Sequence, residues 1–269
     1  MHRYEEPCIS GQNGSGTVFF TGCDMRCPFC QNYEISRGGK GININGDELV
    51  YLMEALADKG AENINLVTPT VWTNKLIPIL EIAKKTVKIP IVWNSGGTDR
   101  AENTERLRGL VDVWLPDFKY SDNGLARRYG AVDNYCEKTF AAVSAMRAAQ
   151  PTDVFDARGI MQKGVVVRHL VLPDASDNTR GVMKKIADID KTMYVSVMGQ
   201  YFPTPSVASH PSLGRKLIES EYDDAVNAFF AAGLSNGFAQ DLDSATEEYV
   251  PDFNPSEVLS LLSARGGRR

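Results

Sequence analysis

Three cysteines close together constrain this chain of 269 residues more than any other feature. Cys23, Cys27 and Cys30 form a C-x3-C-x2-C pattern inside the loop 22–33, and no fourth cysteine lies near them. Thiolates at this spacing on a short loop can converge on one face of a cubane iron–sulfur cluster. Three ligands leave one iron open, whereas a cluster that only transfers electrons normally has every iron ligated by protein. The pattern therefore predicts a [4Fe–4S] cluster that accepts a further ligand at its open iron.

Other roles for the cysteines fit the sequence less well. A structural zinc site takes four ligands, and His2, His169 and His210 have no zinc-finger spacing. A disulfide would leave an odd number of thiols among the five cysteines and needs an oxidising compartment. Cys8 is a candidate fourth ligand, but it precedes the first expected strand, so a packed free thiol is the favoured interpretation.

Composition indicates a globular protein and argues against two classes of partner. Hydrophobic residues make up 43% of the chain and charged residues 23%, which are ordinary values. The net charge of −5 argues against a general surface for large nucleic acids or anionic membranes. No apolar run approaches the roughly 20 residues of a membrane span, and residues 1–7 lack the apolar segment of a secretory signal. With an odd number of cysteines, these features predict a cytoplasmic protein.

Strand and helix signals alternate along the chain. The predicted strands, which are β-branched and aromatic runs between turn signals, lie at 16–21, 64–67, 90–93, within 111–118, at 165–172 and at 193–198. The predicted helices, which carry apolar residues at helical spacing, lie at 47–59, 75–86, 101–110, within 122–150, after Asp177 and at about 221–232.

Two helices and both ends of the chain carry more specific expectations. Asp47 is the expected N-cap of the first helix. The second half of 122–150 is expected to gather its apolar side chains on one side, namely Phe140, Val143, Ala145 and Met146. Residues 1–14 are expected to be irregular and the tail 265–269 disordered.

About six strands alternating with helices predict right-handed βαβ units and a parallel α/β sheet. No internal repeat or inter-domain linker is visible, so one domain covering 1–269 is the simpler interpretation, with a C-terminal helix and tail at about 221–269. The alternation alone allows an open doubly wound sheet or a barrel. In both architectures ligands bind at the carboxyl ends of the strands, so polar residues there are candidates for a site.

Polar residues follow the second and third predicted strands. Thr68 and Thr70 come directly after the second strand. Asn94 and Ser95 follow the third strand and precede two glycines, which allow a backbone to approach a ligand closely. Ordinary turns explain both segments equally well.

Charged residues mark the later strands. Asp117 and Lys119 alternate at the end of the fourth strand, so their side chains point to the same side, and a surface ion pair is the alternative. Arg168 interrupts an apolar strand and needs a partner because burying a lone guanidinium is costly. We expect it to face the interior and to pair with a carboxylate or a cofactor. His169 would face the other way as a hydrogen-bonded core histidine, and Gln200 is a weaker candidate after the sixth strand.

The cysteine loop, with an aromatic residue before its last cysteine, resembles that of the radical S-adenosylmethionine (SAM) superfamily. The resemblance implies a partial (β/α)6 TIM-like barrel and a [4Fe–4S] cluster whose open iron is chelated by SAM. It also implies that reduced flavodoxin or ferredoxin supplies an electron that releases a 5'-deoxyadenosyl radical from SAM.

The resemblance also implies a set of SAM contacts. Phe29 would lie against the adenine, and the pair of Asp117 and Lys119 resembles the Asp-x-Lys pair that contacts the methionine part of SAM in glycyl-radical activating enzymes. The segment 68–70 departs from the Gly-Gly-Glu of many relatives, so only its hydroxyls or carbonyls can take over that role. The expected SAM contacts are Phe29, Thr68, Thr70, Asn94, Ser95, Asp117, Lys119, Arg168 and Gln200.

From Glu5 to about Asn254 the chain is similar to the group labelled as resembling the activating enzyme of pyruvate formate-lyase. One implied function is hydrogen abstraction from a small molecule, as in a lyase that releases queuine from queuosine 5'-phosphate for salvage, and this is favoured. The alternative is an activating enzyme that installs a glycyl radical on a partner. A non-enzymatic iron–sulfur electron carrier or sensor is the third hypothesis, against which the open iron and the pair of Asp117 and Lys119 argue.

Overall fold

The computed structural model describes residues 1–240, 242 and 253–266. Its strands are β1 (Gly16–Phe19), β2 (Ile64–Val67), β3 (Ile91–Ser95), β4 (Val113–Pro116), β5 (Val154–Phe155), β6 (Met161–Leu170), β7 (Tyr194–Met198) and β8 (Gly237–Ala239). They form one sheet in the order β1-β2-β3-β4-β6-β7-β8, in which every neighbouring pair is parallel.

The sheet is an open barrel, because in the described part of the chain no strand pairs β1 with β8. The predicted α/β class and partial parallel barrel are therefore confirmed, and the sheet contains two strands beyond the six that were predicted. β5 adds an antiparallel pair beside β6, and β8 adds a parallel strand beyond β7. Both are two or three residues long, too short to give a periodic signal in the sequence.

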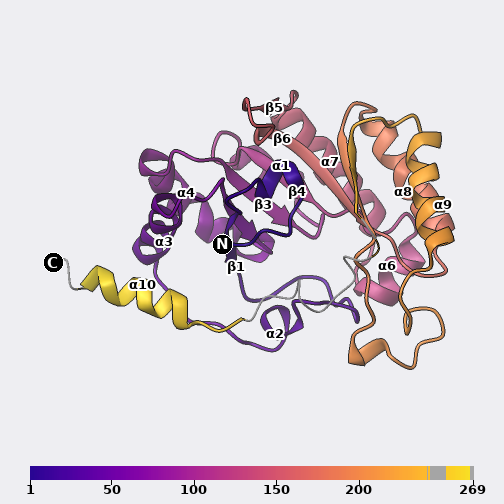
Figure 1. Ribbon diagram of the computed structural model, residues 1–269, viewed down its shortest axis with the longest axis horizontal. Coiled ribbons are helices and arrows are strands. Elements are labelled where there is room, and N and C mark those ends of the chain that lie inside the picture. Colours follow the sequence, from indigo (N-terminus) through magenta and orange to yellow (C-terminus); the bar gives the residue numbers. More distant parts are fainter. Residues whose placement is uncertain (241, 243–252, 267–269) are drawn as a thin grey trace.

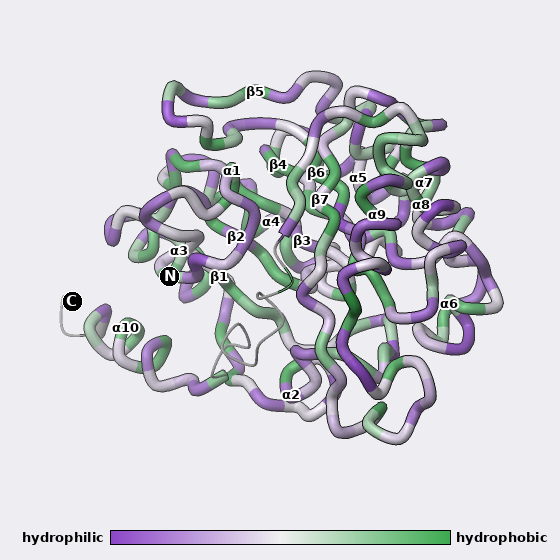
Figure 2. Tube along the Cα trace, turned by 45° about the vertical axis from the view of Figure 1, so that its right-hand side comes forward, coloured by the Kyte–Doolittle hydropathy of each residue, from purple (hydrophilic) through white to green (hydrophobic). Residues whose placement is uncertain are grey.

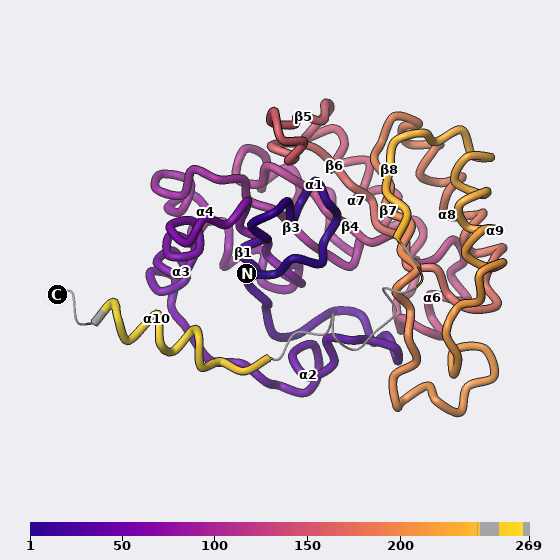
Figure 3. The backbone as a smooth tube through the Cα atoms, viewed as in Figure 1, coloured from indigo at the N-terminus to yellow at the C-terminus, as the bar shows by residue number. Residues whose placement is uncertain are grey.

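Helices cover the outside of the strands (Figures 1 and 3). The longer ones are α3 (Gly46–Asp58), α4 (Thr73–Thr86), α6 (Asn123–Gly130), α7 (Tyr135–Ala149), α8 (Ser176–Ile189), α9 (Glu219–Ala231) and α10 (Ser256–Gly266). The shorter ones are α1 (Pro7–Ser10), α2 (Tyr33–Ser36), α5 (Ala101–Arg106) and the 3-10 turns η1 (Thr70–Trp72) and η2 (Pro205–Val207). Figure 2 shows hydrophobic stretches of chain running through the central strands that these helices surround.

Two details of the helices differ from the sequence prediction. Helix α3 is capped by Asn45, whose side chain accepts from the Glu48 backbone while Glu48 reaches back to the Asn45 backbone. This capping box satisfies two orphan N–H groups, whereas Asp47 lies inside the first turn. In α7, Phe140 is exposed although Val143 and Met146 are buried.

The N-terminal segment is irregular as predicted except for α1, which packs against the inner face of the sheet. Cys8 and Ile9 are buried in a small cluster with inward-facing residues of the strands, namely Val92, Val113, Leu115, Met161 and Val166. The Asn63 amide donates to the Ile9 carbonyl at 2.7 Å and holds the helix there. Burial of Cys8 inside this cluster raises the pKa of its thiol.

The C-terminal region also differs from the prediction of a disordered tail. Residues 265 and 266 belong to α10, while 267–269 lie outside the described residues. Helix α10 lies along α3, where Lys59 pairs with Glu257 at 2.9 Å and the Arg265 guanidinium lies over the Tyr51 ring. Among the described helices, none has the length and apolar character needed to cross a membrane.

Candidate active site

A pocket of about 200 Å³ lies at the edge of the sheet where the strands end. It is lined by residues from the ends of six strands or just beyond them, namely Phe19, Val67, Asn94, Asp117, Leu170 and Met198. The N-terminal segment and the cysteine loop complete the wall with His2, Tyr4, Glu5, Cys27, Phe29, Cys30, Gln31 and Asn32. Because the carboxyl ends of parallel strands are the usual place for α/β active sites, this pocket is the candidate site.

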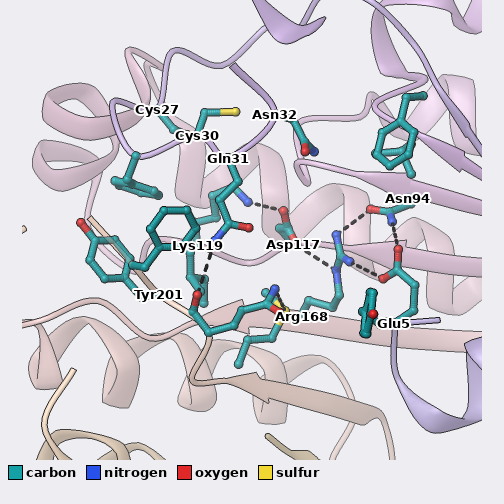
Figure 4. Close-up of a pocket in the computed structure, with 18 of the residues that line it drawn as sticks. Glu5, Cys27, Cys30, Gln31, Asn32, Asn94, Asp117, Lys119, Arg168 and Tyr201 are labelled. Atoms are coloured by element: carbon teal, nitrogen blue, oxygen red, sulfur yellow. Dashed lines mark hydrogen bonds and ion pairs between the residues drawn. The ribbon is translucent and has the colours of Figure 1, made fainter. Parts of the chain in front are cut away.

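Arg168 is the centre of a buried network along one side of the pocket (Figure 4). Its Nε donates to Asp117 at 3.0 Å, its Nη1 to Glu5 at 3.1 Å and its Nη2 to the Asn94 side-chain oxygen at 2.6 Å. Glu5 also accepts from the Asn65 amide at 3.0 Å. The expected partner of Arg168 was a carboxylate or a cofactor, and the structure provides two carboxylates.

The network continues from Asp117 to Lys119, which form an ion pair. Burial alone would raise the pKa of Asp117, but Arg168 and Lys119 outweigh it and the pKa is lowered. Burial alone would lower the pKa of Lys119, but Asp117 and then Cys27 outweigh it and the pKa is raised. Both groups are therefore held in their charged forms at neutral pH. The predicted orientation of their side chains to one side agrees with this pair.

The pKa of Glu5 is shifted in the opposite direction to that of Asp117. Burial raises the pKa of Glu5, and the nearby Arg168 offsets that effect only in part. Glu5 is 11% exposed in its side chain and Asp117 12%, so burial is similar. The difference arises because Asp117 has two cationic partners, Arg168 and Lys119, whereas Glu5 has one.

The cysteine loop runs from β1 to α2 and brings two of its thiols, Cys27 and Cys30, to the pocket. Burial raises the pKa of Cys23 to about 12 and also raises that of Cys27, while the cation of Lys119 acts on Cys27 in the opposite direction. The Met25 N–H donates to the Cys23 sulfur at 3.4 Å. Cys27 and Cys30 also raise the pKa of Cys23, and Cys30 raises that of Cys27, because thiolates repel one another.

Hydrogen bonds to the backbone fix the shape of this loop. The Arg37 guanidinium donates to the Cys27 carbonyl at 2.5 Å, and the Arg26 N–H donates to the Gly130 carbonyl at 2.7 Å. The hydroxyls of Thr204 and Ser206 both donate to the Pro28 carbonyl at 2.9 Å. The loop is thus held by Arg37, which follows it closely in sequence, and by two distant segments at Gly130 and at Thr204 and Ser206.

The three thiols of the cysteine loop lie near enough to one another for their charges to interact. Among the described residues, no three histidine, cysteine or acidic side chains are close enough to hold one metal ion. In a cubane cluster each cysteine binds a different iron, so the thiols surround the cluster instead of meeting at one point. The cysteine loop therefore fits the predicted [4Fe–4S] group.

Phe29 and Gln200 also line the pocket, as predicted. The Phe29 ring packs edge-on against Tyr201 with centroids 5.7 Å apart, and the Tyr201 hydroxyl donates to the Leu213 carbonyl at 2.6 Å. The Gln31 amide donates to the Gln200 carbonyl at 3.4 Å, which joins the cysteine loop to the segment after β7.

Three of the predicted SAM contacts lie outside the lining of the pocket: Thr68, Thr70 and Ser95. The hydroxyls of Thr70 and Ser95 donate to Asp99 at 3.0 and 2.5 Å, together with the Trp93 indole at 3.0 Å. Burial raises the pKa of Asp99, although these three donors oppose it. Thr70 and Ser95 therefore tie two loops together through a carboxylate that the sequence did not single out.

His169 is a core residue, as predicted. Its ring nitrogens lie 2.8 Å from the Phe118 carbonyl and 2.9 Å from the Thr179 hydroxyl, and burial lowers its pKa to about 4. The residues that sequence reasoning missed come mainly from the N-terminal segment, above all Glu5. Its only sequence signal is a pair of acidic residues beside a proline, which does not distinguish a buried carboxylate from a solvated one.

Residues 17–186 match the sequence profile of the radical SAM superfamily. The chain belongs to the radical SAM superfamily. An uncharacterized protein of Methanocaldococcus jannaschii is 30% identical over 224 residues, which are 79% of this chain and 61% of that relative. Members of the superfamily bind a [4Fe–4S] cluster and SAM, the two cofactors expected for this radical SAM chain.

Solved structures of radical SAM enzymes share the fold at low sequence identity. The hydrogenase maturase HydG of Carboxydothermus hydrogenoformans matches with a TM-score of 0.59 and 14% identity, covering 93% of this chain and 65% of that one. SuiB of Streptococcus suis, bound to its precursor peptide, matches with a TM-score of 0.59 and 12% identity, covering 86% and 50%. Methylornithine synthase matches with a TM-score of 0.53 and 17% identity, covering 93% and 81%.

Proposed function

We propose that this protein is a radical SAM lyase that acts on a small molecule, and that its substrate is queuosine 5'-phosphate, from which it releases queuine. The observation that carries the proposal is a single pocket that joins two thiols of the cysteine loop to the charged network of Arg168.

In this proposal Cys23, Cys27 and Cys30 hold the [4Fe–4S] cluster, and SAM completes its coordination. When bound, these cofactors supply a 5'-deoxyadenosyl radical after one electron arrives from reduced flavodoxin or ferredoxin. Lys119 orients the carboxylate of the methionine part of SAM, because it is a buried cation that also interacts with Cys27. Asp117 holds the Lys119 ammonium in place from the other side.

Other residues of the pocket position the ligands and exclude water. Phe29, backed by Tyr201, offers an apolar ring for the adenine, and Gln200 lies beside it. Arg168 and Asn94 have their side chains engaged with protein groups, so they shape the pocket and hold Asp117 in place.

The end of the pocket away from the cysteines remains for the substrate. In Figure 4, Glu5 and Asn94 lie at the side of the network opposite Cys27 and Cys30. Asn32 and His2 also line the pocket. The Asn32 amide and the His2 imidazole offer donors and acceptors to a polar nucleotide, which supports this class of substrate over an apolar one.

The test measures 5'-deoxyadenosine from anaerobically reconstituted protein with SAM and a reductant, with and without queuosine 5'-phosphate. We expect a large rise with the nucleotide, accompanied by free queuine. Slow cleavage of SAM that the nucleotide does not change would reject this substrate and favour an enzyme that installs a glycyl radical on a partner. No binding or cleavage of SAM would reject the enzymatic proposal and favour an electron carrier or sensor.

A matched pair of cysteine variants tests the cluster ligands. Cys23→Ala is expected to lose the iron and all cleavage of SAM while keeping its fold. Cys136→Ala is the control, because Cys136 is buried beside the Tyr120 carbonyl, outside the cysteine loop, and its iron content is expected to match the wild type. Iron analysis and circular dichroism give the two readouts, and full iron content in Cys23→Ala would contradict the assignment.

A further inference from the structure

Tyr120 carries a buried hydroxyl that has no hydrogen-bond partner among the described residues. Its side chain is fully buried, one residue beyond Lys119 at the edge of the pocket. A buried hydroxyl without a partner is destabilising, so such a group in a folded protein calls for an explanation. If the ring served only for packing, phenylalanine would fit equally well and would have no hydroxyl to desolvate.

A neighbouring tyrosine shows how differently a buried hydroxyl is normally treated. Tyr135 packs edge-on against Tyr120 with ring centroids 5.3 Å apart. The Tyr135 hydroxyl accepts from the Lys119 N–H at 2.9 Å and lies 3.2 Å from the carbonyl oxygens of Gly96 and Asp117. Two tyrosines of the same small cluster thus have opposite hydrogen-bonding states.

Geometry places the Tyr120 ring near Cys27. The ring lies beside Gly130, whose carbonyl accepts at 2.7 Å from the N–H of Arg26, the residue before Cys27. Burial raises the pKa of Tyr120 well above its usual value, and the charge and hydrogen-bonding capacity of Cys27 raise it further. The phenol is therefore neutral and able to donate. A thiol is a weak acceptor, whereas a metal-bound thiolate carries negative charge and is a much better one.

Packing holds the Tyr120 ring beside the cysteine loop. A Cβ atom built on Gly130 would lie 3.3 Å from the Tyr120 ring and 3.0 Å from the Met25 side chain, so both side chains occupy the space that the glycine leaves. Met25 is itself buried inside the cysteine loop, two residues before Cys27. The ring cannot turn its hydroxyl away from the loop without disturbing this contact.

We propose that the Tyr120 hydroxyl donates a hydrogen bond to the Cys27 sulfur when that sulfur ligates the [4Fe–4S] cluster, and thereby raises the reduction potential of the cluster. The inference rests on the proposed function, since it requires the cluster to be held by Cys27. A donor to a cluster sulfur stabilises the more negative, reduced state more than the oxidised state, and hydrogen bonds to the sulfurs are among the factors that set cluster potentials. Tyr120 is accordingly a positioning and tuning residue, with no contact to substrate required.

The test compares one-electron midpoint potentials of reconstituted proteins by electron paramagnetic resonance during redox titration. For Tyr120→Phe we expect the equilibrium constant of reduction to fall by about tenfold, a negative shift of roughly 59 mV for one electron. Tyr201→Phe is the matched control, because that residue lies in the same pocket but its hydroxyl is committed to the Leu213 carbonyl. Its potential is expected to equal that of the wild type.

A second variant covers the case in which Tyr120→Phe does not retain its iron. Replacing Tyr120 by 3-fluorotyrosine keeps the shape and strengthens the donor, so the potential is expected to move in the positive direction. Unchanged potentials in the iron-loaded variants would overturn the inference, as would a fluorotyrosine shift in the negative direction. Failure of the wild type to bind a cluster would instead contradict the cluster assignment, and iron analysis separates the two results.

Discussion

Removing the guanidinium of Arg168 is the sharpest test of how the pocket is held together. In Arg168→Met, Glu5 and Asp117 lose a shared partner, although their side chains are only 11% and 12% exposed. Breaking a buried ion pair by removing one member typically costs about 3–5 kcal/mol, because the remaining charge stays buried and uncompensated. Two carboxylates are affected here, but Asp117 keeps Lys119, so we expect a loss of about 4 kcal/mol.

The assay is urea unfolding of the metal-free, reduced protein at pH 7, followed by circular dichroism. Arg180→Met is the matched control, because Arg180 is 55% exposed and pairs with Asp177, which is 97% exposed. Surface pairs of this kind contribute about 0–1 kcal/mol. Equal losses in the two variants would refute the argument that burial makes the Arg168 pairs costly to break.

A double-mutant cycle then shows how much of the stability lost in Arg168→Met is due to the unpaired carboxylate of Glu5. Adding Glu5→Gln to Arg168→Met removes the carboxylate that has no other cation, so part of the lost stability is expected to return. The coupling energy between the two positions is expected at about 1–3 kcal/mol, within the range found for residues in one network. Additive losses would mean that Glu5 is stabilised mainly by Asn65 and Asn94.

Two further predictions concern stability. His169 has a pKa of about 4 in the folded protein and 6.5 as its reference value; the folded state binds fewer protons between these values, so stability is lost as pH falls from about 6.5 to 4. This loss is about 3 kcal/mol. The free energy of unfolding of His169→Gln, measured between pH 6.5 and 4, is expected to lack it. An equal slope of unfolding free energy against pH in that variant would contradict the assignment. Gly97 has a φ of +82°, and a Cβ there would overlap the Asp117 carbonyl oxygen, whereas Gly109 has a φ of +80° with open space around it. Gly109→Ala is expected to lose about 1–2 kcal/mol of stability through backbone strain. Gly97→Ala is expected to lose about 1–3 kcal/mol more through overpacking. Equal thermal unfolding midpoints of the two variants would contradict the expected overpacking at Gly97.

The sequence predicted best those elements whose stability is local. Strand β2 was predicted residue for residue, and α3, α4 and α9 within about two residues at each end, because each carries its own apolar period. The missed elements, α1, β5, β8 and α10, depend on contacts with distant parts of the chain. The exposure of Phe140 in α7 was missed for the same reason, because the neighbouring elements decide which side of a helix is covered.

The site was predictable to the extent that its residues follow strands or share a short loop. Spacing alone indicated the cysteine loop and the common side of Asp117 and Lys119, and polarity within an apolar strand indicated that Arg168 needs a partner. The identity of that partner could not be predicted, because Glu5 reaches the pocket only through the packing of α1 inside the barrel. Asp99 escaped notice for a similar reason: its three donors come from two segments, with Trp93 and Ser95 in β3 and Thr70 in η1.

The placement of Glu5 has a consequence for how the chain folds during its synthesis. Glu5 and Arg168 are 163 positions apart, so the ribosome must complete β6 before the carboxylate meets its guanidinium. Until then the N-terminal segment can form neither this ion pair nor its contacts with Val166 and Met161. Domains generally fold as units, so the first residues wait for β6. The pocket, whose lining extends to Phe202, therefore assembles only after residue 202 has been synthesised.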